Sequence, residues 1–246
     1  MKEWITGRNP VYELLKANRR HCFRLWIAKG LKAEGRLRQI IQLTREHQIM
    51  TEQVPRNHLD NIYANHQGIA METSAYPYAA LSDILKHSKA QNEAPFFLVL
   101  DLIQDPQNLG TLLRSAEVMG VHGVVIPIAR SALVTPAVVT ASSGATEHLL
   151  IAQYNLAQAI ERLKAADAWI IGLDENPRSK LPEQLNMNMG IAMVVGNEGQ
   201  GLRRLVRKSC DELLRIPMVG NVGSLNASVA GSIALYLARQ ARSTGK

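Results

Sequence analysis

Six apolar runs recur along the last two-thirds of the chain, each short enough to form a buried strand. They are Phe96 to Ile103, Gly123 to Pro127, Leu149 to Ala152, Trp169 to Leu173, Ile191 to Gly196 and Leu213 to Met218. Helix-compatible stretches separate most of these runs, at Gly110 to Met119, Leu156 to Ala166 and Leu202 to Cys210, and a long helix is expected from Leu225 to Arg242. Apolar strands that alternate with helices indicate an α/β fold, in which helices cover both faces of a mainly parallel sheet.

The N-terminal third alternates helix and strand on a smaller scale. Asn9 is a candidate helix cap with Pro10 in the first helical position. The elements expected after it are strands at Phe23 to Ala28, Ile49 to Val54 and Ile69 to Thr73, an amphipathic helix at Arg36 to His47 and a short helix near Arg56 to Ala64. This pattern predicts a small α/β domain over residues 1–75.

Residues 76–94 connect this domain to the apolar runs. They carry Pro, Ser, Lys and Asn without sustained alternation, although Leu81 to His87 could form a short helix. We therefore expect a linker over residues 76–94 and a second domain over residues 95–246.

Composition places the chain among globular proteins. It has 246 residues, of which 46% are hydrophobic, so a full core can be buried. Cys22 and Cys210 lie far apart and outside any Cys/His cluster, which predicts neither a disulfide framework nor a metal site. No apolar leader is present and no run approaches the roughly 18 apolar residues that span a bilayer, so we expect a cytoplasmic protein that does not enter a membrane.

The net charge of +7 is unevenly distributed. Residues 1–75 contain 12 lysines and arginines against 7 aspartates and glutamates, whereas residues 76–246 contain 16 against 14. A concentration of positive charge indicates contact with a polyanion such as nucleic acid. Charge alone fits an ordinary soluble surface equally well.

Three segments combine glycine with polar residues directly after apolar runs. They are Asn108 to Arg114, Val195 to Gly201 and Ile216 to Ser228. The carboxyl ends of parallel strands meet at one edge of a sheet, where open α/β folds bind their ligands, so we expect the three segments to converge there. Glycine lets a ligand approach the backbone closely. This pattern is typical of an enzyme.

Each segment also has a purely structural interpretation. Asn108 could cap the helix that follows it, and Arg114 could pair with an acidic residue one turn later. Glu198 could cap the next helix, and Ser224 or Asn226 could cap the last one. Capping requires one side chain per helix, however, and does not explain three glycine-containing polar loops on one sheet.

Two of the segments bear on the class of ligand. The glycines from Gly196 to Gly201 match neither Gly-x-Gly-x-x-Gly nor the Gly-Lys-Ser/Thr end of a phosphate-binding loop, which disfavours a nicotinamide-dependent oxidoreductase. Arg114, in contrast, is expected near the positive end of a helix, and its guanidinium fork matches two phosphate oxygens. Arg114 is therefore a credible contact for a polyanion, and an ion pair with Glu117 on the same helix explains it equally well.

Taken in order, Asn108 to Arg114, Gly196 to Gly201 and Ile216 to Ser228 resemble the three motifs of the SpoU/TrmH family of RNA 2′-O-ribose methyltransferases, in the SPOUT superfamily. The N-terminal part is similar to the family's ribosomal-protein-like (L30e-like) RNA-binding domain, through Gly7 to Val11 and His66 to Ile69. The resemblance implies a trefoil knot in the catalytic domain, a homodimer and S-adenosylmethionine as methyl donor. In length and layout the chain is most similar to members that methylate a guanosine of 23S rRNA.

The resemblance also implies roles for individual residues. The expected catalytic set is Arg114, Asn108, Glu198, Ser224 and Asn226, and the expected cofactor-binding set is Gly196, Asn197, Ile216, Met218 and Leu225. A guanidinium is effectively always protonated, so we expect Arg114 to act as an electrostatic clamp on a phosphate and the developing alkoxide rather than as a base. Glu198 or an RNA phosphate is the expected proton acceptor.

RNA contacts are expected in the N-terminal domain. The candidate residues are Arg8, Arg19, Arg20, Arg24, Lys29, His66 and Gln67, although a tight turn explains the last two equally well. Three alternatives stay open for the protein as a whole. They are the same reaction on tRNA, the same reaction at another rRNA site, and a non-catalytic RNA-binding protein of this fold.

Overall fold

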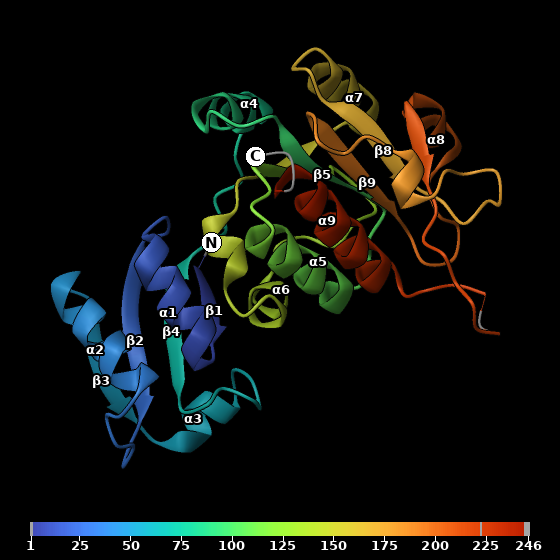
Figure 1. The fold of residues 1–246 in the computed structure, drawn as a ribbon. Helices are drawn as coiled ribbons and strands as arrows, with labels where there is room; N and C mark the ends of the chain where they lie inside the picture. Colours follow the sequence, from blue (N-terminus) through green and yellow to red (C-terminus); the bar gives the residue numbers. More distant parts are fainter. Residues whose placement is uncertain (1, 222, 244–246) are drawn as a thin grey trace. The chain divides into compact units, whose positions relative to one another are not determined.

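The computed structural model describes residues 2–221 and 223–243, and the chain forms two compact units. The first unit comprises Met1–Pro77 and Leu133–His148, and the second comprises Tyr78–Ala132 and Leu149–Lys246. Figure 1 labels their helices and strands. The chain therefore leaves the second unit after Ala132, contributes one segment to the first unit, and returns at Leu149.

The first unit is built on a four-stranded sheet, within the described residues, in the order β1-β4-β2-β3. Its strands are β1 (Lys2–Thr6), β2 (Cys22–Ala28), β3 (Met50–Val54) and β4 (Ile69–Ser74), and its helices are α1 (Arg8–Ala17), α2 (Arg36–Glu46), α3 (Arg56–Asp60), α6 (Pro136–Ala141) and the 3₁₀ helix η1 (Ala145–His148). β1 and β2 run antiparallel to β4, whereas β3 runs parallel to β2. Leu59 of α3 packs on Ala28, Val54 and Ala70 of the sheet.

A buried ion pair ties the inserted segment Leu133–His148 to the rest of the first unit. Arg20 is 4% exposed and Glu147 is 1% exposed. The Arg20 guanidinium donates to both carboxylate oxygens of Glu147, from Nε at 2.9 Å and from Nη2 at 2.8 Å. Nearby, the Tyr76 hydroxyl donates to the carbonyl of Thr146 at 3.1 Å. Since charged groups are buried only when they are paired, this pair accounts for the place of a mid-chain segment in the first unit.

The second unit contains, within the described residues, a six-stranded sheet in the order β10-β8-β9-β5-β6-β7. Its strands are β5 (Phe96–Asp101), β6 (Gly123–Pro127), β7 (Ile151–Tyr154), β8 (Trp169–Leu173), β9 (Ile191–Gly196) and β10 (Glu212–Leu214). Its helices are α4 (Leu81–Ala90), α5 (Pro106–Val118), α7 (Leu156–Lys164), α8 (Arg204–Ser209) and α9 (Ala227–Ser243), with a 3₁₀ turn η2 at Pro182–Gln184. Each strand runs parallel to its neighbours, which confirms the expected α/β class.

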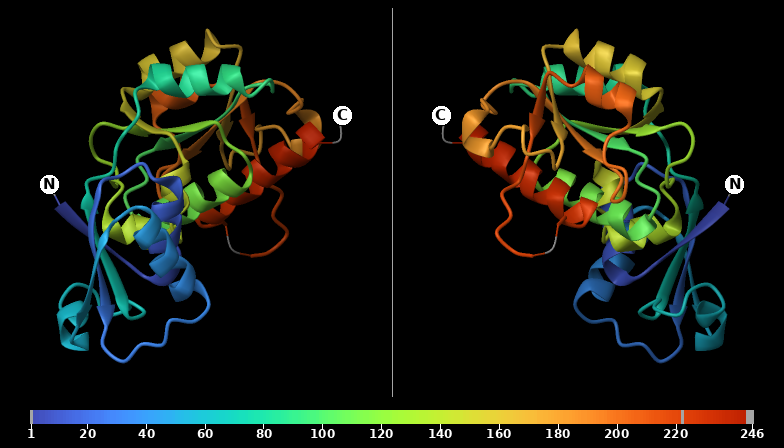
Figure 2. Two further views of the ribbon diagram at one scale, coloured as in Figure 1. Left: turned by 90° about the vertical axis from the view of Figure 1, so that its left-hand side faces the viewer. Right: turned by 90° about the vertical axis from the view of Figure 1, so that its right-hand side faces the viewer.

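Helices cover both faces of the parallel sheet, as Figure 2 shows. α4, α7 and α8 share a buried cluster with Phe97 and Val99 on one face. α5 and α9 pack side by side on the other. Gly231 of α9 permits this close approach, because a Cβ there would lie 2.4 Å from Cδ2 of Leu112 and 3.1 Å from Cγ2 of Val195. Coverage on both faces explains why the strands are almost continuously apolar.

The structure differs from the sequence expectation at several boundaries. The pattern does not predict β1, whose five residues pair with β4. Gly7 is the N-cap of α1, so Asn9 lies inside the helix and does not cap it. The segment expected as a linker over residues 76–94 contains α4, which packs on β6 and β7 and belongs to the second unit. The catalytic domain expected from residue 95 onward also lacks Leu133–His148, which Arg20 holds in the first unit.

Two further expectations concern topology and membranes. The trefoil knot implied by the family resemblance stays a prediction. Among the helices of the described residues, none combines the length and the hydropathy that a membrane crossing requires.

Candidate active site

The carboxyl ends of β5 and β9 lie side by side near the middle of the parallel sheet. Asp101, the last residue of β5, is in register with Gly196, the last residue of β9. The sheet continues from β5 to β6 and β7 on one side, and from β9 to β8 and β10 on the other. The strand order therefore reverses between β5 and β9, which is the place where open parallel sheets bind ligands.

Two tethers hold the loop after β9 against the end of β5. The fully buried Asp101 carboxylate accepts hydrogen bonds from the backbone N–H of Arg203 at 2.8 Å and from its Nε at 2.6 Å. The Asn197 side chain donates from Nδ2 to the carbonyl of Leu102 at 3.3 Å. The loop Gly196–Gly201 is therefore anchored near its start and just after its end, despite its glycine content.

Close packing of this loop on itself requires glycine at its first position. A Cβ on Gly196 would lie 2.3 Å from the carbonyl carbon of Gly201 and 2.6 Å from the nitrogen of Leu202. Asn197 and Gly201 exchange two backbone hydrogen bonds, at 3.2 and 2.9 Å, which close the loop into a tight turn. No other residue type fits at Gly196 without displacing this backbone.

The three polar segments meet through a trio of side chains, Asn108, Glu198 and Asn226. Oε1 of Glu198 accepts hydrogen bonds from Nδ2 of Asn108 at 2.8 Å and from Nδ2 of Asn226. The same nitrogen of Asn226 also donates to Oδ1 of Asn108 at 3.1 Å. The trio draws one residue from α5, one from the loop after β9 and one from the residue before α9. The expected convergence of the three segments at one sheet edge is therefore confirmed.

Asn108 and Glu198 are not helix caps. The N-cap of α5 is Asp105, whose carboxylate accepts from the N–H of Asn108 at 2.8 Å. The N-cap of α8 is Arg203, which lies beyond the loop that carries Glu198. The capping alternatives are therefore wrong for these two residues, because their side chains point to each other instead.

Asn226 combines a structural and a site contact. Its Oδ1 accepts from the N–H of Ser228 at 2.9 Å and from that of Val229 at 3.2 Å, which satisfies the first turn of α9. Its Nδ2 donates to Glu198. The capping interpretation therefore holds for Asn226, and the site contact exists beside it.

A cavity of about 250 Å³ is lined by the ends of three strands and the first turns of α9. Its lining contains Glu198 and the whole expected cofactor set, Gly196, Asn197, Ile216, Met218 and Leu225. Further lining residues that the sequence does not single out include Leu173, Asp174, Glu175, Leu214 and Arg215. They lie at the carboxyl ends of β8 and β10, so the rule that points to the other strand ends would also have found them.

Of two charged side chains in the cavity wall, Asp174 forms an ion pair and Arg215 has a nitrogen without a hydrogen-bond partner among the described residues. The Asp174 carboxylate pairs with Nη2 of Arg207 at 2.5 Å. The Nε of Arg215 is buried and has no hydrogen-bond partner among the described residues. Buried donors in proteins almost always have a hydrogen-bond acceptor, so a bound ligand with an acceptor at this point would supply the missing hydrogen bond.

Arg114 and Ser224 lie outside the described cavity lining. Arg114 is exposed on α5, on the same helix as Asn108. Ser224 is exposed in the segment before α9, two residues before Asn226. Both residues are therefore accessible from solvent at elements that carry the trio.

Two residues expected to contact RNA are buried instead. The Arg20 side chain has no exposed surface because Glu147 and Glu3 surround it, so the expectation of RNA contact is wrong for this residue. His66 is also fully buried, and its Nδ1 accepts from the N–H of Gly68 at 2.8 Å. It shapes the turn that enters β4, as the structural alternative predicts.

The other residues of that set remain at the surface. Arg19 and Arg24 are partly exposed, but both donate to acceptors of the protein itself. Gln67 is exposed, and its Oε1 accepts from the N–H of Arg8 at 2.8 Å. Arg8 is likewise partly exposed, and its Nε donates to the carbonyl of Gln67 at 3.4 Å. Lys29 and Gln67, which are both exposed, are therefore the members best placed to meet an external partner.

Family models match both parts of the chain. The model described as "SpoU rRNA Methylase family" matches residues 95–236, and the model described as "RNA 2'-O ribose methyltransferase substrate binding" matches residues 4–79. A Bacillus subtilis protein named "Putative TrmH family tRNA/rRNA methyltransferase YacO" is 41% identical over 236 residues, which are 95% of this chain and 94% of that protein.

Solved structures share the fold. The SpoU methyltransferase AviRb from Streptomyces viridochromogenes, in complex with AdoMet, has a TM-score of 0.81 at 21% identity and covers 100% of this chain and 92% of its own. An AdoMet-bound rRNA methyltransferase from Sinorhizobium meliloti has a TM-score of 0.80 at 23% identity and covers 97% of this chain and 87% of its own.

Proposed function

The chain belongs to the SpoU rRNA Methylase family, and from this premise we propose that it transfers a methyl group from S-adenosylmethionine to a ribose 2′-hydroxyl of RNA, at a guanosine of 23S rRNA. The observation that carries the proposal is the hydrogen-bonded trio Asn108, Glu198 and Asn226, which joins three distant segments beside the cavity. A structural explanation covers only the capping contact of Asn226.

The cavity residues fit S-adenosylmethionine. The absence of a side chain at Gly196 and the apolar side chains of Ile216 and Leu225 suit a flat adenine ring, and the unsatisfied Nε of Arg215 suits a ligand acceptor. When bound, S-adenosylmethionine supplies an electrophilic methyl group on a sulfonium. AviRb, whose fold this chain shares, was solved with AdoMet, which supports the same donor here.

The trio would orient the reacting ribose. Both amide donors converge on Oε1 of Glu198, whereas Oε2 receives no hydrogen bond from the described residues. Oε2 is therefore available to accept the proton of the attacking hydroxyl. Asn108 and Asn226 hold the carboxylate in place, so that positioning supplies much of the rate.

Arg114 would stabilise charge in the transition state. The 2′-hydroxyl becomes an alkoxide as its proton leaves, and the positive charge of a guanidinium stabilises that negative charge. Ser224 would contribute a hydroxyl to the same ribose. For Arg114→Ala we expect a loss of turnover with an unchanged Kd for S-adenosylmethionine. Arg162→Ala, on α7, is the control and should keep both turnover and this Kd at the wild-type values.

The RNA target is tested by direct methylation. Unmodified transcripts of 23S rRNA, 16S rRNA and tRNA are incubated separately with labelled S-adenosylmethionine, and the methylated nucleotide is mapped. We expect a 2′-O-methylguanosine in 23S rRNA. Label in tRNA or 16S rRNA alone would assign the same reaction to another RNA, whereas donor uptake in calorimetry without transfer to any RNA would make the protein a non-catalytic member of the fold.

We also propose a homodimer that forms through α5 and α9. These adjacent helices expose three apolar side chains, Val118, Val229 and Tyr236. Val229 and Tyr236 are seven residues apart and therefore share one face of α9. A grouped exposed apolar face of this kind supports a protein contact. Sedimentation equilibrium should give twice the chain mass, and Tyr236→Glu should shift the protein towards the monomer.

A further inference from the structure

We propose that the catalytic unit carries its own RNA-binding surface on α8, formed by Arg178, Arg204, Arg207 and Lys208 and called here the α8 basic surface. This inference rests on the proposed function, because it takes RNA as the substrate. It assigns phosphate contacts to a part of the chain whose overall charge does not reveal them.

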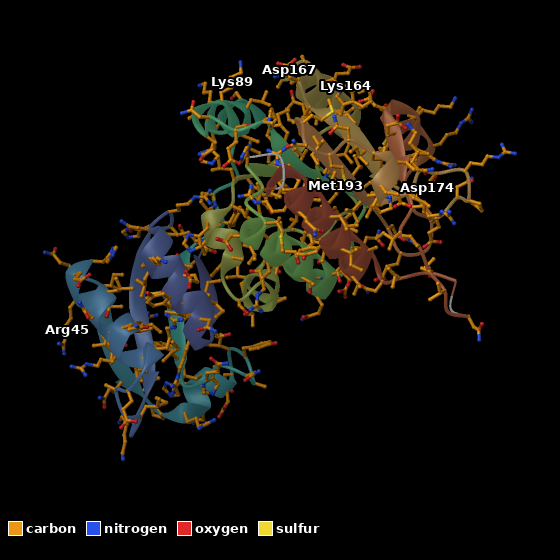
Figure 3. The ribbon with its side chains drawn as sticks, in the orientation of Figure 1. Arg45, Lys89, Lys164, Asp167, Asp174 and Met193 are labelled. Carbon is orange, nitrogen blue, oxygen red and sulfur yellow. The ribbon has the colours of Figure 1, made fainter. Side chains whose placement is uncertain are left out.

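Positive charge is concentrated on α8, within a region whose total charge is nearly balanced. Residues 76–246 carry 16 basic against 14 acidic side chains, a nearly balanced region. The six residues of α8, Arg204–Ser209, nevertheless include three cations and no carboxylate. The segment between β8 and β9 adds Arg178, which directly precedes Ser179. The side chain of Ser179 donates to the Asp174 carboxylate, at the end of β8. Figure 3 shows Asp174 at this end of the sheet.

Most of these cations have no anionic partner among the residues that the structure describes. Arg207 pairs with Asp174 at 2.5 Å. Arg178, Arg204 and Lys208 are exposed, and none of them forms an ion pair with a described residue. The apolar Leu205 between them is 72% exposed, so no described part of the protein covers this side of α8.

The arrangement on the helix brings the cations together. Arg204, Arg207 and Lys208 follow the spacing i, i+3 and i+4, which places them on one helix face. Like charges at this spacing destabilise a helix unless an anion lies between them. A row of phosphates would supply that anion, and arginine forks match phosphate oxygens in pairs.

The α8 basic surface also adjoins the candidate active site. Arg203, the N-cap of α8, donates to Asp101 at the end of β5, and the Glu198 loop ends just before it. A strand of RNA whose ribose lies at the trio would continue past this helix end. Phosphates next to the methylated nucleotide are therefore the chemical group that this surface is suited to bind.

The test removes two charges from the surface and two from elsewhere in the same unit. The variant Arg204→Gln/Lys208→Gln is compared with the control variant Lys86→Gln/Lys89→Gln. Both control residues lie on α4, the helix that packs against β6 and β7. Binding of a 23S rRNA transcript is measured from low to high salt, and binding of S-adenosylmethionine is measured by calorimetry. Neither pair belongs to the trio or to the cavity lining.

For the α8 variant we expect the RNA Kd to rise about tenfold. The slope of log K against log salt should fall by about 2, because each of the two neutralised side chains ceases to bind a phosphate. The S-adenosylmethionine Kd should stay within about twofold, and the α4 variant should match the wild type. An unchanged slope in the α8 variant, or an equal change in the α4 variant, would overturn the inference. If the wild type itself transfers no methyl group to any RNA, it is the proposed function that fails, whatever the α8 variant does.

Discussion

Asp101 and Arg203 are far apart in sequence, yet the Asp101 carboxylate accepts two hydrogen bonds from Arg203, at 2.8 Å from the backbone N–H and at 2.6 Å from Nε. The carboxylate is fully buried, whereas the Arg203 side chain is 45% exposed. The pair connects the end of β5 to a residue just beyond the Gly196–Gly201 loop. Since Glu198 lies in that loop, Asp101 positions a member of the trio without touching it.

Replacing Asp101 by Asn should weaken this connection. The new amide would lose the ion pair and turn an NH₂ group towards an N–H donor, so the free energy of unfolding should fall by about 2 kcal/mol. The less constrained loop should also bind S-adenosylmethionine several-fold more weakly. Thermal unfolding and calorimetry measure the two effects. Asp83→Asn is the control, because Asp83 is exposed and lies 4.0 Å from its nearest cation, Lys86. Full donor affinity in Asp101→Asn would contradict the positioning role.

Gly196→Ala should lower the free energy of unfolding and the affinity for S-adenosylmethionine more than Gly220→Ala. Gly196→Ala forces a Cβ to within 2.3 Å of the Gly201 backbone, which has no flexible end to move aside. Overpacking of this kind costs about 1–3 kcal/mol, and the displaced loop should lose donor binding. A Cβ at Gly220 would meet no heavy atom within 4 Å, so Gly220→Ala should retain stability. Equal unfolding midpoints for the two variants would show that the loop can relax.

Two substitutions at Asn226 should separate its capping contact from its site contact. Serine is a good N-cap but cannot donate to Glu198 as the amide does, so Asn226→Ser should keep the unfolding free energy within about 0.5 kcal/mol while lowering kcat. Alanine removes both contacts, and Asn226→Ala should lose about 1 kcal/mol of stability as well as activity. Wild-type kcat in Asn226→Ser would leave Asn226 as a helix cap only.

Breaking the buried Arg20–Glu147 pair should lower the free energy of unfolding by an amount that depends on pH. Burial raises the pKa of the Glu147 carboxyl above its ordinary value, and Arg20 is the largest opposing influence. Arg20→Leu should raise that pKa further. A carboxyl with a raised folded-state pKa stabilises the protein at low pH, and this contribution is lost as the pH rises through the folded-state pKa.

The defect of Arg20→Leu should therefore be smaller at about pH 5 than at about pH 8, where it should reach about 3–5 kcal/mol. Urea unfolding at the two pH values measures this difference. Arg45→Leu is the matched control, since Arg45 is exposed and projects from α2 (Figure 3), and its effect should be small at both pH values. A defect of Arg20→Leu that is independent of pH would mean that Glu147 stays ionised without its partner.

The sequence by itself predicts the parallel sheet and the place of its ligands. The runs Gly123 to Pro127, Trp169 to Leu173 and Ile191 to Gly196 coincide with β6, β8 and β9, because strands covered on both faces leave a nearly unbroken apolar signal. The sheet-edge rule also predicts correctly that segments around Asn108 and Asn226 come together.

What the tertiary structure decided is the role of individual polar side chains. Arg20 and Arg8 are both arginines of the basic N-terminal region, and the sequence predicts RNA contact for each. In the structure Arg20 is buried and paired with Glu147, which lies far away in the sequence. No local sequence pattern identifies that partner. Asn108 and Glu198 look like helix caps in sequence and instead bind each other. Apolar periodicity is a local property and can be read along the chain, whereas a hydrogen bond between distant residues depends on where the folded backbone brings them.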